Sequence, residues 1–199
     1  MPVLRDELGS DIARLLETLG TLPQPAARPS FIVISGLPGT GKSRLAGLLR
    51  NRLNYLVLES DRMRKAIFPR PSYEPEESAR LFRSMHGLAE LLLKRGISVI
   101  LDATNLSEHN REYLYNIADR TRARLVMVQV EAPPELVKER LSLRRREPQN
   151  GSDADWTVYQ KMKSEAEKIG RHHIVVDTSQ DVSPAIEKIV SEAEGGRRL

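Results

Sequence analysis

The chain has 199 residues, no cysteine and a net charge of +4, from 31 Lys and Arg against 27 Asp and Glu. This length suits one compact domain with a substantial core, and the lack of cysteine excludes a disulfide framework and a thiolate metal site. Because no run of about 18 apolar residues and no signal-peptide core occurs, we expect a cytoplasmic protein without a membrane segment. The mild positive excess suits anionic ligands but does not by itself indicate nucleic acid.

The first 29 residues are predicted to form a helix and a linker. Leucine and isoleucine recur at helical spacing between Leu8 and Leu19, which predicts an amphipathic helix over residues 5–20 that docks on the rest of the chain. Residues 22–30 contain three prolines, as expected of a linker. We therefore divide the chain into an N-terminal helix with its proline-rich linker (1–29) and a main domain (30–199).

From residue 31 onward, apolar strands alternate with helices, which is the pattern of an α/β protein. The strands are apolar on both faces, as a buried parallel sheet requires. Five strands are predicted, at 31–35, 55–59, 97–102, 124–130 and 173–177. Helices are predicted at 43–52, 62–67, 77–95, 108–121, 134–146, 153–168 and 183–193.

The first of these strands leads into Gly-Leu-Pro-Gly-Thr-Gly-Lys-Ser, a complete Walker A motif. Its glycines can adopt backbone angles closed to other residues, so successive N–H groups can turn toward phosphates, and the next helix adds its positive end. The Lys42 ammonium is predicted to bind the β- and γ-phosphates, and the Ser43 hydroxyl to ligate Mg2+. The candidate nucleotide-binding residues are Gly36, Gly39, Thr40, Gly41, Lys42, Ser43, Arg44 and, from a later helix, Arg140.

The second predicted strand is followed by a carboxylate that is a candidate catalytic base. Asp61 follows this strand, and the carboxyl ends of strands in an open α/β sheet point into the ligand crevice. The Asp61 carboxylate could take a proton from an attacking hydroxyl, and Arg64, one helical turn on, could bind an anion or the transferred group. Spacing alone leaves open the alternative that Ser60 or Asp61 caps the helix and that Arg62 and Arg64 are solvated. It also leaves open whether the proline-rich loop 68–75 contacts the acceptor.

The third strand ends in Asp102, as a Walker B strand does. Such an aspartate orders Mg2+, usually through water, although a turn or capping role is the alternative. The next residue is Ala103, where a mechanical ATPase usually has a glutamate that activates water. The Asn-Lys-x-Asp motif of a GTPase is also missing from the sequence. These features favour transfer to a hydroxyl group over hydrolysis.

The predicted helix 134–146 is basic and is separated from the next helix by a flexible turn at 147–152. Arg140 and Arg144 are four residues apart and share a face of that helix. A basic helix followed by a flexible turn is typical of a closing lid, because arginines over the phosphates offset the charge of the transition state. Arg144 is our first choice for this role, and a solvated basic face that includes Arg145 and Arg146 is the alternative.

Four segments together resemble the P-loop kinase family that contains the polynucleotide 5′-hydroxyl kinases and many uncharacterised predicted kinases. Zeta toxins, chloramphenicol phosphotransferase and gluconate kinase are more distant members of the same grouping. The resemblance covers about residues 30–193. It is carried by the Walker A loop, by Ser-Asp-Arg-Met-Arg at 60–64, by Asp-Ala-Thr-Asn-Leu at 102–106 and by Glu-Leu-Val-Lys-Glu-Arg at 135–140.

The resemblance implies a P-loop NTPase three-layer sandwich with a five-stranded parallel sheet in the order 2-3-1-4-5 and a helical lid at about 140–165. It further implies ATP as donor, Asp61 as general base, Arg64 near the acceptor and Arg144 as the lid arginine. Asn105 and Arg111 would line the acceptor side, or could equally hold the loop after the third strand.

The sequence therefore predicts an ATP- and Mg2+-dependent phosphotransferase with a hydroxyl acceptor. The acceptor is either a small molecule or the 5′-hydroxyl of a polynucleotide, and only 5% of the residues are aromatic, so no platform for stacking single strands is evident. A nucleotide-dependent switch or binding module with weak ATPase activity is the alternative. Neither a membrane nor a protein partner is indicated by the sequence.

Overall fold

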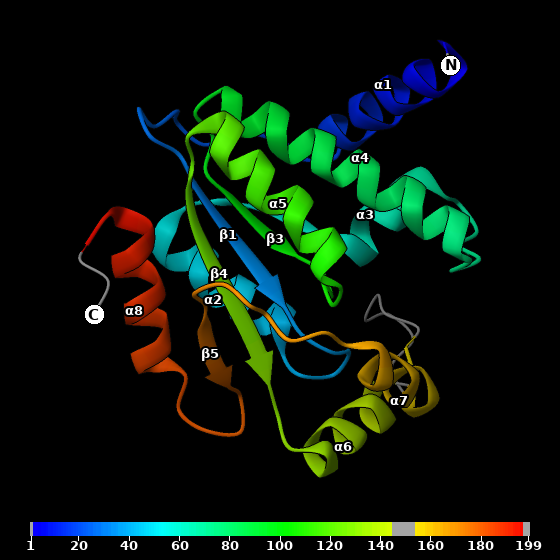
Figure 1. Cartoon of the computed structure of the whole chain (residues 1–199), viewed down its shortest axis with the longest axis vertical. Coiled ribbons are helices and arrows are strands. Elements are labelled where there is room, and N and C mark those ends of the chain that lie inside the picture. The colour runs from blue at the N-terminus through cyan, green and yellow to red at the C-terminus, as the bar shows by residue number, and fades with distance from the viewer. Residues whose placement is uncertain (1, 145–153, 197–199) are drawn as a thin grey trace.

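A computed structural model describes residues 2–144 and 154–196, and the side chains from residue 7 onward within them. Its centre is a five-stranded sheet in which every pair is parallel and the order is β2-β3-β1-β4-β5, as predicted (Figure 1). The strands are β1 (Ser30–Ser35), β2 (Leu56–Glu59), β3 (Val99–Asp102), β4 (Arg124–Glu131) and β5 (Ile174–Asp177). This is the fold of a P-loop NTPase-like α/β protein.

The central strand β1 is buried along its whole length because it has a neighbour on each side and helices on both faces. Phe31 pairs with Val99 of β3, and Ile32 pairs with Val126 of β4. Alternate β1 side chains enter two separate cores: Phe31 belongs to one and Ile32 to the other. The continuous apolar run predicted from the sequence follows from this double burial.

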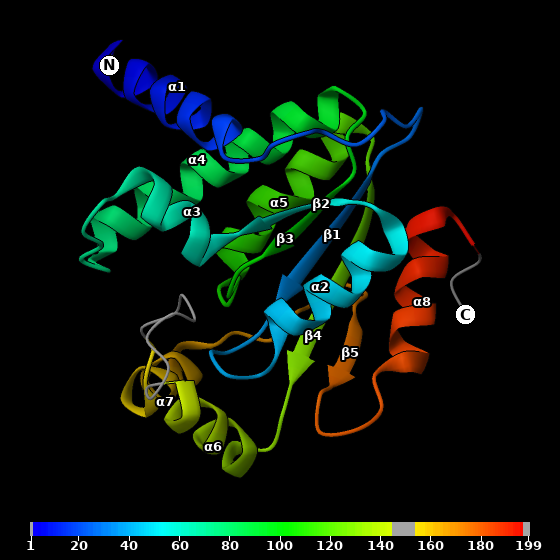
Figure 2. The ribbon, with the colours of Figure 1, turned by 180° about the vertical axis from the view of Figure 1, so that it is seen from behind.

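Helices cover both faces of the sheet and form the outer layers of a three-layer sandwich (Figures 1 and 2). Helices α1, α3, α4 and α5 cover one face and α2 and α8 the other, while α6 and α7 lie at the carboxyl end of the strands. None of the described helices has the length and apolar character needed to cross a membrane. Their bounds are α1 (Pro2–Glu17), α2 (Lys42–Leu53), α3 (Ser60–Ile67), α4 (Pro75–Lys94), α5 (Glu108–Thr121), α6 (Pro134–Arg144), α7 (Trp156–Glu165) and α8 (Ser183–Glu194).

The helix predicted at 153–168 is shorter than expected. The carboxylate of Asp155 accepts a hydrogen bond from Val158 N–H at 3.0 Å, and this cap begins α7 at Trp156. The helix ends at Glu165 because the following chain is bound elsewhere: Glu167 N–H donates to Leu106 O at 3.0 Å. The other elements lie where predicted, with ends that differ by a few residues, and the turn predicted at 147–152 falls outside the described residues, as do Arg145 and Arg146.

The N-terminal helix α1 packs against α3 and α4. Leu15 is fully buried in the core that these helices share with the sheet. Asp11 is 3% exposed and receives two hydrogen bonds from the Arg80 guanidinium, both 2.8 Å, and a third from the Ser84 hydroxyl at 3.2 Å. Arg14 also donates to Ile67 O, at the end of α3, at 3.3 Å. Helix α1 therefore fixes both α3 and α4.

We expect Asp11→Asn to lower the free energy of unfolding by about 2 kcal/mol, because it weakens charge-assisted hydrogen bonds to Arg80. The Arg80 guanidinium lowers the pKa of Asp11 in the folded state. A carboxylate whose folded pKa is lowered contributes stability above its unfolded value, near pH 4, and loses it as the pH falls through the folded pKa. The free energies of unfolding of the native protein and of Asp11→Asn, measured in urea, should therefore differ at pH 7 and converge toward pH 3. The exposed Glu17→Gln is the control, and a pH-independent difference would contradict the argument.

Candidate active site

The Walker A loop connects β1 to α2 at the carboxyl edge of the sheet. Gly36 has φ +155°, and a Cβ there would lie 2.5 Å from the carbonyl oxygen of Val130. Gly39 has φ +80°, and its Cβ would lie 2.9 Å from Val137 Cγ1 on α6. Both positions thus require glycine for backbone angle and for space. Gly41, with φ +100°, is the N-cap of α2.

The Lys42 side chain is half-buried at this edge. Its ammonium donates to Leu37 O, within the loop, at 3.0 Å. Burial lowers the pKa of Lys42, whereas the charges of Asp102 and Asp61 oppose that shift and raise it. Lys42 is therefore in the field of both carboxylates that the sequence analysis selected.

Asp102 ends β3 and is 2% exposed. Burial raises its pKa, while the charge of Lys42 and a hydrogen bond from the Ser43 hydroxyl lower it. Its Oδ2 atom is buried and has no hydrogen-bond partner. A buried carboxylate oxygen is rarely left unpaired in a native protein. The Oδ2 atom can therefore still coordinate a cation or accept a hydrogen bond from a cation-bound water.

Two further carboxylates lie beside Asp102. Glu59, the last residue of β2, is paired with Asp102 in the sheet register, and Asp61 stands in the first turn of α3. Burial raises the pKa of Glu59, and the charges of Asp102 and Asp61 raise it further. Glu59 rather than Ser60 or Asp61 takes the N-cap position of α3. The sequence analysis missed Glu59 as a site residue, although its place at the end of a parallel strand next to Asp102 could have indicated it.

Arg64 is buried in an ion pair with Glu77. Its side chain is 8% exposed, and one guanidinium nitrogen is paired with the Glu77 carboxylate while the other donates to the Ser78 hydroxyl at 3.2 Å. The ring of Tyr73 covers the guanidinium, with the Arg64 Cζ atom 4.8 Å from the ring centroid. The structure therefore contradicts the alternative that Arg64 is solvated.

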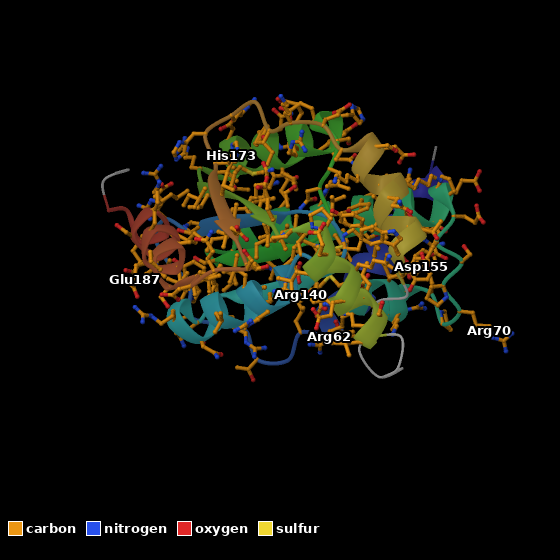
Figure 3. All side chains as sticks on the ribbon, turned by 90° about the horizontal axis from the view of Figure 1, so that it is seen from below. Arg62, Arg70, Arg140, Asp155, His173 and Glu187 are labelled. Atoms are coloured by element: carbon orange, nitrogen blue, oxygen red, sulfur yellow. The ribbon has the colours of Figure 1, made fainter. Side chains whose placement is uncertain are left out.

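The two predicted lid arginines lie in different surroundings. Arg140 donates to the carbonyls of Gly39 and Thr40 at 3.4 and 3.3 Å, and to the Thr178 hydroxyl at 2.8 Å. Figure 3 looks onto this edge of the molecule and shows Arg140 near its centre. Arg144, the last residue of α6, is half-buried, and its charge acts on Lys42, Glu59 and Asp102.

Thr178, just after β5, joins the loop from the other side. Its hydroxyl donates to Thr40 O at 2.6 Å, and a Cβ on Gly41 would lie 3.2 Å from its methyl carbon. The sequence analysis did not select Thr178. Its position after a parallel strand is the signal that could have found it, because the carboxyl ends of the strands share one edge.

Asn105 and Arg111 hold the loop after β3. The Asn105 side-chain amide donates to Ile34 O at 2.9 Å. Arg111 is completely buried and donates to Asn105 O at 2.9 Å, and to the carbonyls of Glu167 and Lys168 at 3.0 and 2.9 Å. Of the two roles left open for this pair, the structure shows the loop-holding contacts.

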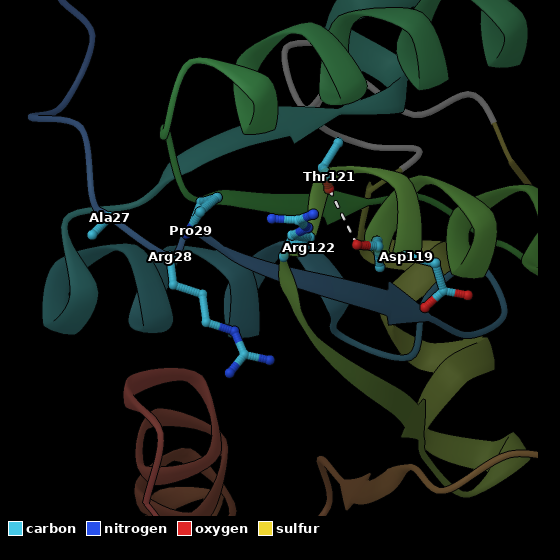
Figure 4. A pocket seen from close by; sticks show the side chains of 8 residues that line it. Ala27, Arg28, Pro29, Asp119, Thr121 and Arg122 are labelled. Atoms are coloured by element: carbon cyan, nitrogen blue, oxygen red, sulfur yellow. Dashed lines mark hydrogen bonds between the residues drawn. The ribbon is translucent and has the colours of Figure 1, made fainter.

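A hollow of about 620 Å³ lies at the opposite edge of the sheet, before the strands begin (Figure 4). It is formed by the linker and the end of α5, and its lining includes Arg28, Asp119 and Arg122. None of the candidate residues lines it. The candidate site is therefore the carboxyl edge, where the Walker A loop, three carboxylates and two arginines of α6 meet.

The sheet order and the loop define the class of protein, a P-loop NTPase of the kinase-like type. The chain belongs to the AAA domain family (AAA_33), whose model matches residues 31–169. No curated protein matches the chain in sequence.

Solved structures share the fold at low identity. The Mycobacterium tuberculosis APS kinase CysC, solved with AMPPNP and APS, is 17% identical with a TM-score of 0.63 and covers 86% of this chain and 100% of its own. Chaetomium thermophilum Kti12, solved with ADP-AlF3, is 20% identical with a TM-score of 0.67, and the match covers 83% of this chain and 100% of the Kti12 chain. A gluconokinase from Sinorhizobium meliloti is 18% identical with a TM-score of 0.59, and the match covers 83% of this chain and 92% of the gluconokinase chain.

Proposed function

We propose that this protein is an ATP- and Mg2+-dependent phosphotransferase that moves the γ-phosphate to a hydroxyl acceptor. The observation that carries the proposal is the gathering of Lys42, Asp61 and Asp102 within one another's field beside the Walker A loop. Phosphoryl transfer needs this arrangement, because catalysis depends chiefly on positioning and on charge stabilisation. Two of the fold relatives were solved with a nucleotide or nucleotide analogue at low identity, which supports nucleotide use here.

Each residue has a role in this reaction. The Walker A backbone and Lys42 bind the β- and γ-phosphates, and Arg144 brings positive charge from the lid formed by α6 and α7. Asp61 accepts the proton of the acceptor hydroxyl as its oxygen attacks phosphorus. The new oxygen–phosphorus bond forms as the bond to the β-phosphate oxygen breaks, and ADP leaves with that electron pair. Arg140 ties the lid to the loop through the contacts described above.

The donor set at this edge suits Mg2+. Ser43 and Asp102 would hold the ion, which supplies charge neutralisation of the phosphates when bound. Within the described residues, no group of three or more His, Asp or Glu is arranged to hold a metal by itself. Mg2+ keeps several waters and is usually bound by one or two protein ligands together with phosphate oxygens. The unpaired Asp102 Oδ2 atom and the negative charges of the neighbouring Glu59 and Asp61 both favour a cation there.

The test is transfer of labelled γ-phosphate from ATP to hydroxyl acceptors by the native protein and by Lys42→Ala. We expect the variant to lose transfer by about 10²-fold or more, because it removes the ammonium that neutralises the phosphates. Lys94→Ala, on the exposed end of α4, is the matched control and should retain full activity. Native protein that binds ATP but phosphorylates no acceptor would favour the switch alternative over the kinase.

A further inference from the structure

The region that follows Asp61 along α3 carries a positive charge that is already neutralised. Arg64 lies one helical turn beyond Asp61 and is the cation of α3 held inside the fold. Its guanidinium nitrogens donate hydrogen bonds to Glu77 and Ser78. The side chains of both Arg64 and Glu77 are less than a tenth exposed. An incoming phosphate would therefore find neither a free guanidinium edge nor an uncompensated charge at this residue.

Glu77 also fixes the loop between α3 and α4. Its carboxylate accepts hydrogen bonds from Ser72 N–H at 2.6 Å, from the Ser72 hydroxyl at 2.8 Å and from Tyr73 N–H at 3.3 Å. Burial raises the pKa of Glu77, but these bonds and the one from Arg64 outweigh it and bring the pKa to about 2. Glu77 therefore stays ionised at neutral pH and holds Arg64 and the loop together.

Tyr73 is held in an unusual conformation by this arrangement. Its φ is +60°, in the left-handed region that an aromatic residue rarely adopts. Such strain persists only where surrounding contacts impose it, and it is concentrated at functional sites. One face of the ring covers the Arg64 guanidinium, while 41% of the residue remains exposed to solvent. The loop thus presents an aromatic surface next to α3.

We propose that this wall, formed by Arg64, Glu77 and Tyr73, selects an uncharged acceptor whose hydroxyl is carried on a ring, and disfavours a polynucleotide. The inference rests on the proposed function and names the acceptor class for the same site. An exposed tyrosine ring offers an apolar face to a sugar, cyclitol or nucleoside ring. A polyanion, in contrast, needs free cations along its path.

Two exposed cations on either side of Arg64 in the chain, Arg62 and Arg70, are directed elsewhere. Arg62 donates to Thr18 O of the N-terminal segment at 3.1 Å. Arg70 extends away from the body of the molecule in Figure 3. The start of α4, just after Tyr73, adds the exposed acids Glu74 and Glu76, which would repel a polyanion.

The experiment compares Tyr73→Ala with the native protein and with Tyr113→Ala, an exposed tyrosine on α5 that serves as matched control. The acceptors are myo-inositol, D-glucose, uridine and a 5′-hydroxyl oligonucleotide. We expect phosphate transfer to at least one uncharged ring compound, with its KM raised about 10-fold in Tyr73→Ala and the KM for ATP unchanged. Its KM should vary less than about 3-fold between about 50 and 300 mM salt.

Two results would overturn the inference: preference for the oligonucleotide with a steep salt dependence, or an unchanged acceptor KM in Tyr73→Ala. Equilibrium binding of the same compounds, with Mg2+ and a non-hydrolysable ATP analogue present, separates this inference from the proposed function. Binding of a ring compound that weakens in Tyr73→Ala, without any transfer, would support the wall and contradict the kinase. Absence of binding by all three uncharged compounds would overturn the wall even if transfer to the oligonucleotide occurs.

Discussion

Asp61→Asn is expected to reduce phosphoryl transfer by about 10²- to 10⁴-fold, the range typical of a lost general base. The amide keeps the size of the carboxylate but cannot take a proton from the acceptor hydroxyl. Because Asp61 stands in the first turn of α3 and not at its cap, the substitution should leave the helix intact. The measurement is kcat for the best acceptor alongside the Kd for ATP, and we expect kcat to fall while the Kd changes little.

Asp119→Asn is the matched control, since Asp119 is exposed at the opposite edge of the sheet. Full transfer by Asp61→Asn would show that the base is another group, with Glu59 the next candidate because it lies beside Asp102. A large change in ATP affinity would show that the Asp61 charge acts mainly on Lys42. A nucleotide-dependent switch predicts a third pattern, in which Asp61→Asn binds ATP normally and no phosphorylated product forms with either protein.

The parts of this fold that the sequence predicted are those encoded locally. Residues 31–34 of β1 are all apolar, on both faces of the strand, and the Walker A glycines begin two residues later, so strand, loop and helix could be placed from one short segment. The sheet order came from the resemblance carried by four such segments, and the structure confirms it. Local patterns are informative here because a buried parallel strand and a phosphate loop each need particular residue types in sequence.

The contacts that decide how residues behave join segments far apart in the chain, and the sequence did not predict them. Arg64 was selected as an acceptor-side cation, but nothing in its own helix shows that Glu77 pairs with it. The ion pair between Arg80 and the buried Asp11 joins α1 to α4 across 69 positions. Tertiary pairs of this kind depend on how helices pack, which periodicity alone does not specify.

The same reasoning explains why α7 was predicted too long. The polar segment after Glu165 has helical composition, but its backbone is bound by partners from the loop after β3 and from α5. Tertiary hydrogen bonds outweigh weak local preference in such a segment. Arg111 is the main partner, so its replacement tests this explanation directly.

Arg111→Leu is expected to lower the free energy of unfolding by about 3–5 kcal/mol, the cost typical of removing one partner from a buried charged network. The guanidinium is fully buried and bonds to Glu108 at 2.7 Å as well as to three backbone carbonyls. Leucine fills part of the volume but leaves these carbonyls without a donor. Chemical denaturation at neutral pH gives the measurement, and Arg52→Leu, whose ion pair with Glu187 is exposed, should cost less than about 1 kcal/mol.

The consequence of Arg111→Leu should extend to the active site, because the loop that Arg111 holds also supports the Walker A loop. Gly36 N–H donates to Thr104 O at 3.1 Å, and the Ser35 hydroxyl donates to Asn105 O at 3.1 Å. Loosening this support should weaken ATP binding in protein that is still folded, whereas Arg52→Leu should not. A loss of stability with unchanged ATP affinity would mean that the phosphate loop is held by β1 and α6 alone. A loss of both stability and ATP affinity would show that Arg111 couples the segment after α7 to the nucleotide site.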